Sequence, residues 1–209
     1  PAYGEDLRDG TNLEQLLKKL VKIPDLRWIR ILYAYPKLSY FSDGLLEMIA
    51  SEEKVCPYLD IPIQHIDDGI LRRMGRRSKG KEVRELLQRI RTFVPEISLR
   101  SSLIVGFPGE GESQFKALLE FVEETRFDHL GVFKYSREEG TPASRLPGQV
   151  PDEVKEERFG ILMERQKAIS LRKNKKFVGK TMEVLIEGRD MKKDVLLGRL
   201  NTQALEIDG

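Results

Sequence analysis

Four predicted β-strands in this chain carry polar or charged side chains on the face opposite their apolar side chains. The strands are WIRILYAY from Trp28, YLDIPIQ from Tyr58, LRSSLIVGF from Leu99 and LGVFKYS from Leu130. Successive side chains along a strand point to opposite faces of a sheet. One face is expected to carry Ile29, Ile31, Tyr33, Leu59, Ile61, Ile63, Leu99, Leu103, Val105, Gly131, Phe133 and Tyr135, and the other Arg30, Asp60, Gln64, Arg100, Ser102, Lys134 and Ser136.

Segments with helical periodicity separate these strands, which predicts parallel strands joined by right-handed helical crossovers. The apolar faces are then expected to lie against the helices, and the polar faces to line a shared interior. A closed eight-stranded barrel fills its interior with branched apolar side chains. Charges in that position must instead be solvated, paired or bound to a ligand. The predicted fold is therefore α/β: a partial, open TIM-like barrel with a polar ligand in its mouth.

Composition changes along the chain and predicts three parts: the barrel strands and helices in residues 1–145, a loop and connecting helix in residues 146–178, and the start of a small antiparallel β domain in residues 179–209. The glycine- and proline-rich loop leads to a long helix from Asp152 to about Lys176. The basic end of this helix fits either the helix dipole or a surface for an acidic partner. TMEVLIEG and DVLLGRL then have the pattern of short strands.

Composition also excludes some classes of site. Cys56 is the only cysteine, which excludes a disulfide framework and any site with several cysteine ligands within this sequence. The net charge of +2 is too small to argue for nucleic-acid binding by itself. No apolar run approaches the roughly 20 residues of a membrane span, and no signal peptide is visible, so a cytoplasmic protein is expected. The start at Pro1 and the end at Gly209 suggest a piece, or the ordered part, of a longer protein.

The loop after the third strand, Gly106-Phe107-Pro108-Gly109-Glu110, is the most specific local feature. Its glycines let the backbone approach a ligand closely, and the helix start that follows favours anions. An ordinary tight turn between strand and helix explains the same residues. In a barrel the active site lies at the carboxyl ends of the strands. Gln64, His65, Gly106, Tyr135 and Ser136 are expected to gather at that end.

The two histidines and the cysteine have simpler interpretations beside functional ones. His65 has the chemistry of a general base or a metal ligand, but a histidine without a spaced partner is more often a hydrogen-bonding residue. His129 begins a strand at the opposite end and is expected to be structural. Cys56, just before Pro57, is expected to be a small buried residue. No catalytic residue and no metal ligand is assigned on this sequence.

Several segments occur in one order that resembles the radical-SAM methylthiotransferases. They are PYLDIPIQH from Pro57, GRR after Met74, LRSSLIVGFPGE from Leu99 and FKYSREEGTPA from Phe133. The tail EVLIEG…VLLGRL…ALEIDG resembles the start of that family's C-terminal β-barrel domain, called TRAM. One branch of the family modifies isopentenyladenosine in transfer RNA and typically has a serine-glycine-serine run after a proline-x-glutamine, whereas here His65 follows Gln64. The resemblance favours the other branch, which modifies an aspartate of small-subunit ribosomal protein number twelve.

The resemblance implies S-adenosyl-L-methionine (SAM) and two 4Fe-4S clusters as cofactors of the whole enzyme. Their cysteine ligands are absent from this sequence, because Cys56 matches neither cluster motif. The chain by itself is therefore expected to be inactive. Implied partners are the small-subunit ribosomal protein or the ribosome, with RNA contact through the TRAM-like domain and no membrane.

The resemblance also suggests roles for residues around the bound nucleoside. Val105, Gly106 and Phe107 are expected at the adenine, and Arg100, Ser102 and Gln64 at the ribose or the methionine carboxylate. His65, Tyr135 and Ser136 are expected on the substrate side. A structural ion-pair network of Arg100, Asp60 and Lys134 is the alternative for the charged residues.

Three rival functions remain at this point. The first is the transfer-RNA branch, which predicts strongly salt-dependent RNA binding. The second is a non-catalytic ribosome- or RNA-binding module. The third is a phosphate-binding barrel enzyme that uses Gly106–Gly109 as its phosphate loop, and binding of SAM or of a sugar phosphate would separate it from the others.

Overall fold

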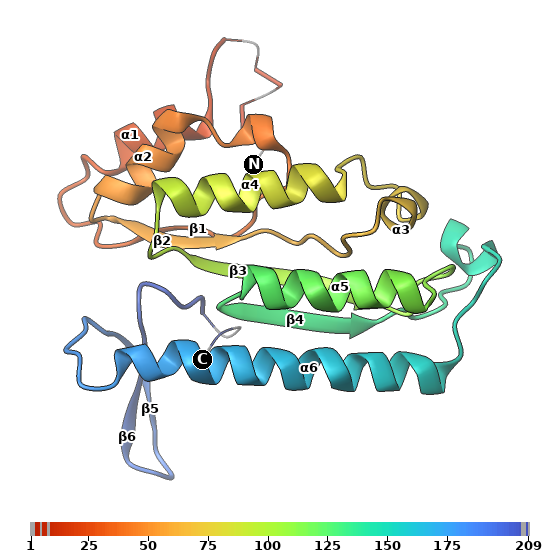
Figure 1. Ribbon diagram of the computed structural model, residues 1–209. Helices are drawn as coiled ribbons and strands as arrows, with labels where there is room; N and C mark the ends of the chain where they lie inside the picture. The colour runs from red at the N-terminus through yellow and green to blue at the C-terminus, as the bar shows by residue number, and fades with distance from the viewer. Residues whose placement is uncertain (1–2, 5, 8, 206–207, 209) are drawn as a thin grey trace.

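The computed structural model describes residues 3–4, 6–7, 9–205 and 208, and its centre is a parallel four-stranded sheet (Figure 1). The strand order is β1-β2-β3-β4, so each strand pairs with its neighbour in the chain. The strands are β1 (Ile29–Ile31), β2 (Val55–Asp60), β3 (Ser98–Val105) and β4 (His129–Lys134). This confirms the α/β, parallel, barrel-like part of the predicted fold.

Helices connect the strands and cover one face of the sheet. In Figure 1, α4 and α5 run alongside the strands, and the longest helix, α6, lies beside β4. The elements outside the sheet are α1 (Leu13–Leu20), η1 (Leu38–Tyr40), α2 (Asp43–Ser51), α3 (Asp68–Arg73), α4 (Gly80–Phe93), α5 (Glu112–Thr125), η2 (Pro142–Arg145), α6 (Asp152–Asn174) and η3 (Lys175–Phe177).

The hydrophobic core lies between the sheet and these helices. Leu59, Leu99 and Leu103 of the sheet segments have no exposed surface, as predicted for the apolar face. They pack in one cluster with helical residues that include Leu86, Leu118 and Leu162. No helix among the described residues covers the opposite face (Figure 1), so the polar side chains of β1, β2 and β3 that were predicted there lie on an open face.

The prediction for β4 placed its faces the wrong way round. Leu130 and Val132 are the buried residues, whereas Phe133 is 55% exposed. The register pairs Ser102 with Gly131 and Ile104 with Phe133, and residues paired across a sheet share a face. Gly131 and Phe133 therefore lie on the open face. The segment LGVFKYS has apolar residues in both alternating sets, so only the pairing with β3 decided its orientation.

Lys134 and Tyr33 were also misplaced by the sequence prediction. Because the two faces of β4 are exchanged, Lys134 points away from the open face. It pairs with Glu156 on α6. Tyr33 is 56% exposed, because β1 ends at Ile31 and Tyr33 lies beyond the paired strand.

A separate antiparallel hairpin follows α6. It consists of β5 (Leu185–Asp190) and β6 (Val195–Arg199), and it projects away from the parallel sheet in Figure 1. Its apolar side chains are exposed, at 41% for Leu185, 52% for Ile186 and 66% for Leu196. An isolated two-stranded hairpin is marginally stable in water. Among the described helices, none combines the length and apolarity needed to cross a membrane.

Candidate functional site at the carboxyl ends of the strands

The polypeptide segments that leave β2, β3 and β4 lie side by side, as predicted. The N–H of Gln64 donates to the carbonyl of Ser102 at 2.8 Å, and the N–H of Ile104 donates to the carbonyl of Gln64 at 2.8 Å. The N–H of Tyr135 donates to the carbonyl of Val105 at 2.9 Å. These bonds bring Gln64, Gly106 and Tyr135 to one edge of the sheet, where parallel α/β folds bind their ligands.

Gln64 has a backbone conformation that the sequence did not reveal. Its φ is +74°, in the left-handed region that residues other than glycine rarely adopt. Such strain is most often found at functional sites, because the surrounding structure must compensate for it. The side chains of Gln64 and Ser102 are half-buried, and neither has a hydrogen-bond partner among the described residues. Both are therefore available to a ligand on the open face.

The GFPGE loop is a tight turn whose N–H groups bond within the protein. The N–H of Gly106 donates to Oε1 of Glu110 at 3.0 Å, and the N–H of Gly109 donates to the carbonyl of Gly148 at 2.8 Å. The N–H of Glu110 donates to the carbonyl of Phe107 at 2.9 Å. These amides have no hydrogen left for an anion. The geometry thus supports the tight-turn interpretation over a phosphate loop at Gly106–Gly109.

Gly106 is required at this turn for two reasons. Its φ is +71°, and a Cβ atom at this position would lie 2.2 Å from Cγ of Lys155 on α6. Next to it, the ring of Phe107 packs edge-on against the ring of Tyr135, with centroids 5.1 Å apart. The hydroxyl of Tyr135 is buried and has no hydrogen-bond partner within the described part of the chain. A buried polar atom without a partner at this edge is a second group that a ligand can satisfy.

His65 belongs to a buried cluster beneath this loop and not to an accessible site. Its side chain has no exposed surface, and Nε2 lies 3.2 Å from Oε2 of Glu110. Nδ1 accepts the N–H of Asp67 at 3.0 Å, which places the ring hydrogen on Nε2, and Nε2 and Oε2 of Glu110 lie close together without forming a hydrogen bond. Oε1 of Glu110 also accepts from Nη1 of Arg158 at 2.7 Å. The expectation that His65 contacts substrate is therefore wrong, and the hydrogen-bonding alternative is confirmed.

Arg100 is on the open face but is already paired. Its Nη1 donates to Oδ2 of Asp60 at 2.8 Å, and its Nε donates to Oδ1 of Asp208 at 3.2 Å. The ion-pair alternative is thus confirmed for Arg100 and Asp60, without Lys134. Burial raises the pKa of Asp60 above its usual value, although Arg100 opposes this shift. Tyr58, whose hydroxyl donates to Asp208 at 2.7 Å, has a pKa raised by burial and by that carboxylate.

The apolar residues predicted at the adenine are covered. Val105 has no exposed surface because its side chain packs in the core under the helices, and Phe107 is 6% exposed. Direct contact through the Val105 side chain is therefore excluded in this conformation. Ile104 is half-buried and Phe133 is exposed on the open face, opposite each other in the register. The sequence analysis missed this pair because it placed Phe133 on the face covered by helices.

Other predicted residues lie as follows. Ser136 is exposed, and its hydroxyl donates to Oε1 of Glu138 at 2.6 Å. Cys56 is 2% exposed, as predicted for a small buried residue. His129 contacts the carbonyl of Thr202 through Nε2 at 3.2 Å, in agreement with its predicted structural role. Glu110, Arg158 and Asp208 were missed. Glu110 could have been found, because it belongs to the loop motif. Arg158 and Asp208 could not, because they contact segments far away in the sequence and no local pattern indicates such contacts.

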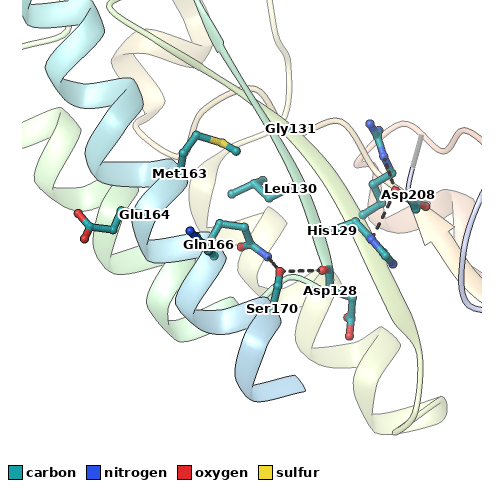
Figure 2. Close-up of a pocket in the computed structure, with 11 residues that line it drawn as sticks. Asp128, His129, Leu130, Gly131, Met163, Glu164, Gln166, Ser170 and Asp208 are labelled. Carbon is teal, nitrogen blue, oxygen red and sulfur yellow. Dashed lines mark hydrogen bonds and ion pairs between the residues drawn. The ribbon is translucent and has the colours of Figure 1, made fainter. Parts of the chain in front are cut away.

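A hollow of about 700 Å³ lies along β4, away from the carboxyl ends (Figure 2). Its walls include His129, Leu130 and Gly131 from β4, and Met163 and Gln166 from α6. Gln166 donates to the carbonyl of Phe127 and to Ser170, but its Oε1 has no partner among the described residues. The hollow is thus separate from the edge that gathers Gln64, Gly106 and Tyr135.

The residues fit a nucleoside ligand better than a metal cluster. Within the described part of the chain, no group of three histidine, cysteine, aspartate or glutamate residues could hold a metal ion. Cys56 packs against Tyr58 and Ala204 at the amino-terminal end of the sheet. An iron–sulfur cluster therefore has no ligand set here, whereas Gln64, Ser102 and Tyr135 offer unpaired polar atoms beside the apolar Ile104 and Phe133.

Comparisons with known proteins identify the superfamily. A family model described as the radical SAM superfamily matches residues 3–122. The ribosomal protein uS12 methylthiotransferase RimO of Syntrophotalea carbinolica is 51% identical over 209 residues, which are 100% of this chain and 46% of that relative. RimO of Geotalea uraniireducens is 52% identical over 208 residues, which are 99% of this chain and 46% of the relative. The chain thus spans about half the length of the curated relatives it matches.

A solved structure shows the same fold. The coproporphyrinogen III oxidase HemN of Escherichia coli, described as a radical SAM enzyme, superposes with a TM-score of 0.54 at 20% identity, over 80% of this chain and 39% of that one. At this identity the likeness concerns the fold alone. Because the family model covers more than half of the residues and the open parallel sheet agrees with it, the chain belongs to the radical SAM superfamily.

Proposed function

We propose that this chain is part of a radical SAM methylthiotransferase that adds a methylthio group to the β-carbon of an aspartate in ribosomal protein uS12. The observation that carries the proposal is 51% identity, over the full 209 residues, to a relative with that name. The open face of the sheet supports it, because the unpaired polar groups lie at the end where such folds bind their ligands.

SAM is proposed to lie on the open face at the carboxyl ends of β2, β3 and β4. When bound, SAM would be cleaved by one electron from a reduced 4Fe-4S cluster, whose ligands are absent from this sequence, and would supply the deoxyadenosyl radical that removes a hydrogen from a carbon too weakly acidic for an ordinary base. In this chain, Gln64 and Ser102 are proposed to hydrogen-bond its ribose. Ile104 and Phe133 are proposed to contact the adenine, with the turn at Gly106 shaping the edge of the site. Tyr135 and Ser136 are proposed on the substrate side.

The residues after β4 are proposed to form a connecting segment, residues 146–178, and the start of a TRAM-like β domain from residue 179. Support comes from the antiparallel pairing of β5 with β6 and from their exposed apolar side chains. An apolar hairpin surface of this kind is stabilised when further strands cover it. RNA contact by this domain, and the ribosomal protein as partner, are parts of the same proposal.

A chimera tests the substrate. Residues 1–209 replace the matching segment of the Syntrophotalea carbinolica relative, and the reconstituted enzyme is assayed with a uS12 peptide and with isopentenyladenosine-containing transfer RNA. We expect a mass increase on the peptide aspartate and none on the RNA. Modification of the RNA alone, or of neither substrate by a folded chimera with both clusters, contradicts the proposal.

Ligand contact is tested in the same chimera. Gln64→Ala and Ser102→Ala are each expected to raise the Kd for SAM by about tenfold, because each removes about 1.4 kcal/mol of hydrogen bonding to the ligand. Gln88→Ala on the outer surface of α4 is the matched control and leaves the Kd unchanged. If all three variants bind SAM equally, the assigned contacts are wrong even when the chimera is active.

A further inference from the structure

A row of hydrogen-bond donors crosses the amino-terminal end of the open face. Each of the four parallel strands contributes at least one side chain to this row, which consists of Arg30, Tyr58, Ser98, Arg100 and His129. None of them belongs to the site at the carboxyl ends. All five contact one segment of the chain that follows the hairpin, namely residues 200–205 and Asp208, which we call the strap.

The strap binds this row through its main-chain carbonyls. Nη1 of Arg30 donates to the carbonyl of Asn201 at 2.9 Å. Oγ of Ser98 donates to the carbonyl of Thr202 at 3.0 Å, and Nε2 of His129 lies 3.2 Å from the same oxygen. The strap is thus fixed across β1, β3 and β4 without any strand pairing among the described residues.

Asp208 provides the charged part of the contact. Its side chain is 1% exposed, and its carboxylate accepts the hydroxyl of Tyr58 at 2.7 Å and Nε of Arg100 at 3.2 Å. Nδ1 of His129 lies 3.5 Å from Oδ1. The same carboxylate accepts the N–H of Ala204 at 2.9 Å. The charged contacts of the strap are thus concentrated on one buried carboxylate.

The apolar part of the contact is small. Ala204 covers Cys56 and Tyr58, with Trp28 packed at the side. Alanine buries far less apolar surface than the leucines of the main core, so most of the strap's attachment is polar. Release of the strap breaks these polar contacts but leaves the core between the sheet and the helices intact, so it is expected to cost less than unfolding of the sheet.

We propose that the strap is a releasable closure that seals the amino-terminal end of the half-barrel and fixes the hairpin of β5 and β6 to it. Asp208 is its central residue, and Arg100 is the strap's binding partner on the sheet. While the strap is bound, the open face is accessible from the carboxyl ends of the strands. Release uncovers Cys56, Tyr58 and the Arg100–Asp60 pair together.

The single cysteine makes release measurable. Cys56 is 2% exposed beneath Ala204, and no other thiol is present in the 209 residues. The measurement uses the chimera described above: mass spectrometry of the Cys56 peptide after thiol modification reports exposure of this one position beside the cluster cysteines of the relative. We expect Asp208→Asn to raise the modification rate at least tenfold, because it removes the charge that binds Arg100. Asp194→Asn, in the exposed turn of the same hairpin, is the matched control and leaves the rate unchanged.

Urea dependence separates release of the strap from unfolding of the whole chain. Local release exposes little surface, so the modification rate in Asp208→Asn is expected to depend weakly on urea below the unfolding transition. Ser98→Ala, which removes one bond to Thr202, is expected to raise the rate by a smaller factor. The proposal is overturned if Asp208→Asn reacts no faster than the unmodified chain, or if its rate follows urea as steeply as global unfolding does.

Discussion

At the scale of single residues, the buried carboxylate of Glu110 has the largest structural consequence. Glu110 and Arg158 are both almost fully buried, with 0% and 8% of their side chains exposed. A buried arginine that loses its carboxylate keeps an uncompensated charge in a poorly solvated place. Glu110 therefore links the loop after β3 to α6, and this link explains why a glutamate ends the GFPGE motif.

Glu110→Gln is expected to lower the free energy of unfolding by about 3 kcal/mol, because it leaves the charge of Arg158 unpaired. Urea unfolding followed by circular dichroism measures the change. Glu112→Gln is the matched control: Glu112 is 88% exposed and lies 3.8 Å from the same arginine. The control is expected to stay within about 0.5 kcal/mol. Equal effects of the two substitutions would contradict the assigned role of Glu110.

Asp60 makes a second residue-scale prediction, which concerns pH. Burial raises the pKa of Asp60 in the folded protein, so between the ordinary value of 3.8 and the raised value the folded state binds more protons than the unfolded state. The contribution of Asp60 to the free energy of unfolding therefore falls as pH rises through this window. The Asp60→Asn variant serves as the reference, because asparagine does not titrate and makes no such pH-dependent contribution.

The measurement compares urea unfolding of the two proteins from pH 3.5 upward. We expect the unfolding free energy of the original chain, relative to Asp60→Asn, to decrease with pH until the carboxyl is fully ionised. A difference that stays constant would show that burial and Arg100 balance at this site, and one that grows with pH would show that Arg100 outweighs burial.

At the scale of elements, the contact between the turn after β3 and α6 requires a glycine. Gly106→Ala must resolve both a φ of +71° and a Cβ placed 2.2 Å from Lys155. Gly140→Ala has a φ of +80° with open space around it, so it meets only the backbone strain. We expect Gly106→Ala to lower the midpoint of thermal unfolding by several degrees more than Gly140→Ala. Similar midpoints would show that α6 moves away freely.

The buried face of a helix or strand could be predicted where its apolar residues all fall on one side of the element. The apolar positions of α4 and α5, and the Leu59 and Leu99 faces of β2 and β3, are buried as their spacing indicated. The orientation of β4 was predicted wrongly, because both of its alternating sets of side chains contain apolar residues and only the pairing with β3 decides between them.

At the scale of the whole molecule, the hairpin and the sheet are expected to differ in stability. β5 and β6 have exposed side chains and pair only with each other within the described residues, whereas β3 lies between two strands under a helix layer. Hydrogen exchange is expected to be fast at residues 185–190 and 195–199 and slow at residues 98–105. Equal protection would mean that the hairpin is stabilised by a contact outside its own pairing.

Sequence alone determined the α/β class and the open polar face, because alternation and helical spacing are local properties of the chain, and it predicted where on this face a ligand binds. Its motifs also indicated the superfamily. Only the tertiary structure decided which face of β4 is buried, that His65 is paired with Glu110, and that Asp208 binds Arg100. Each of these depends on contacts between segments far apart in the chain, and no local pattern encodes which distant carboxylate a buried cation will meet.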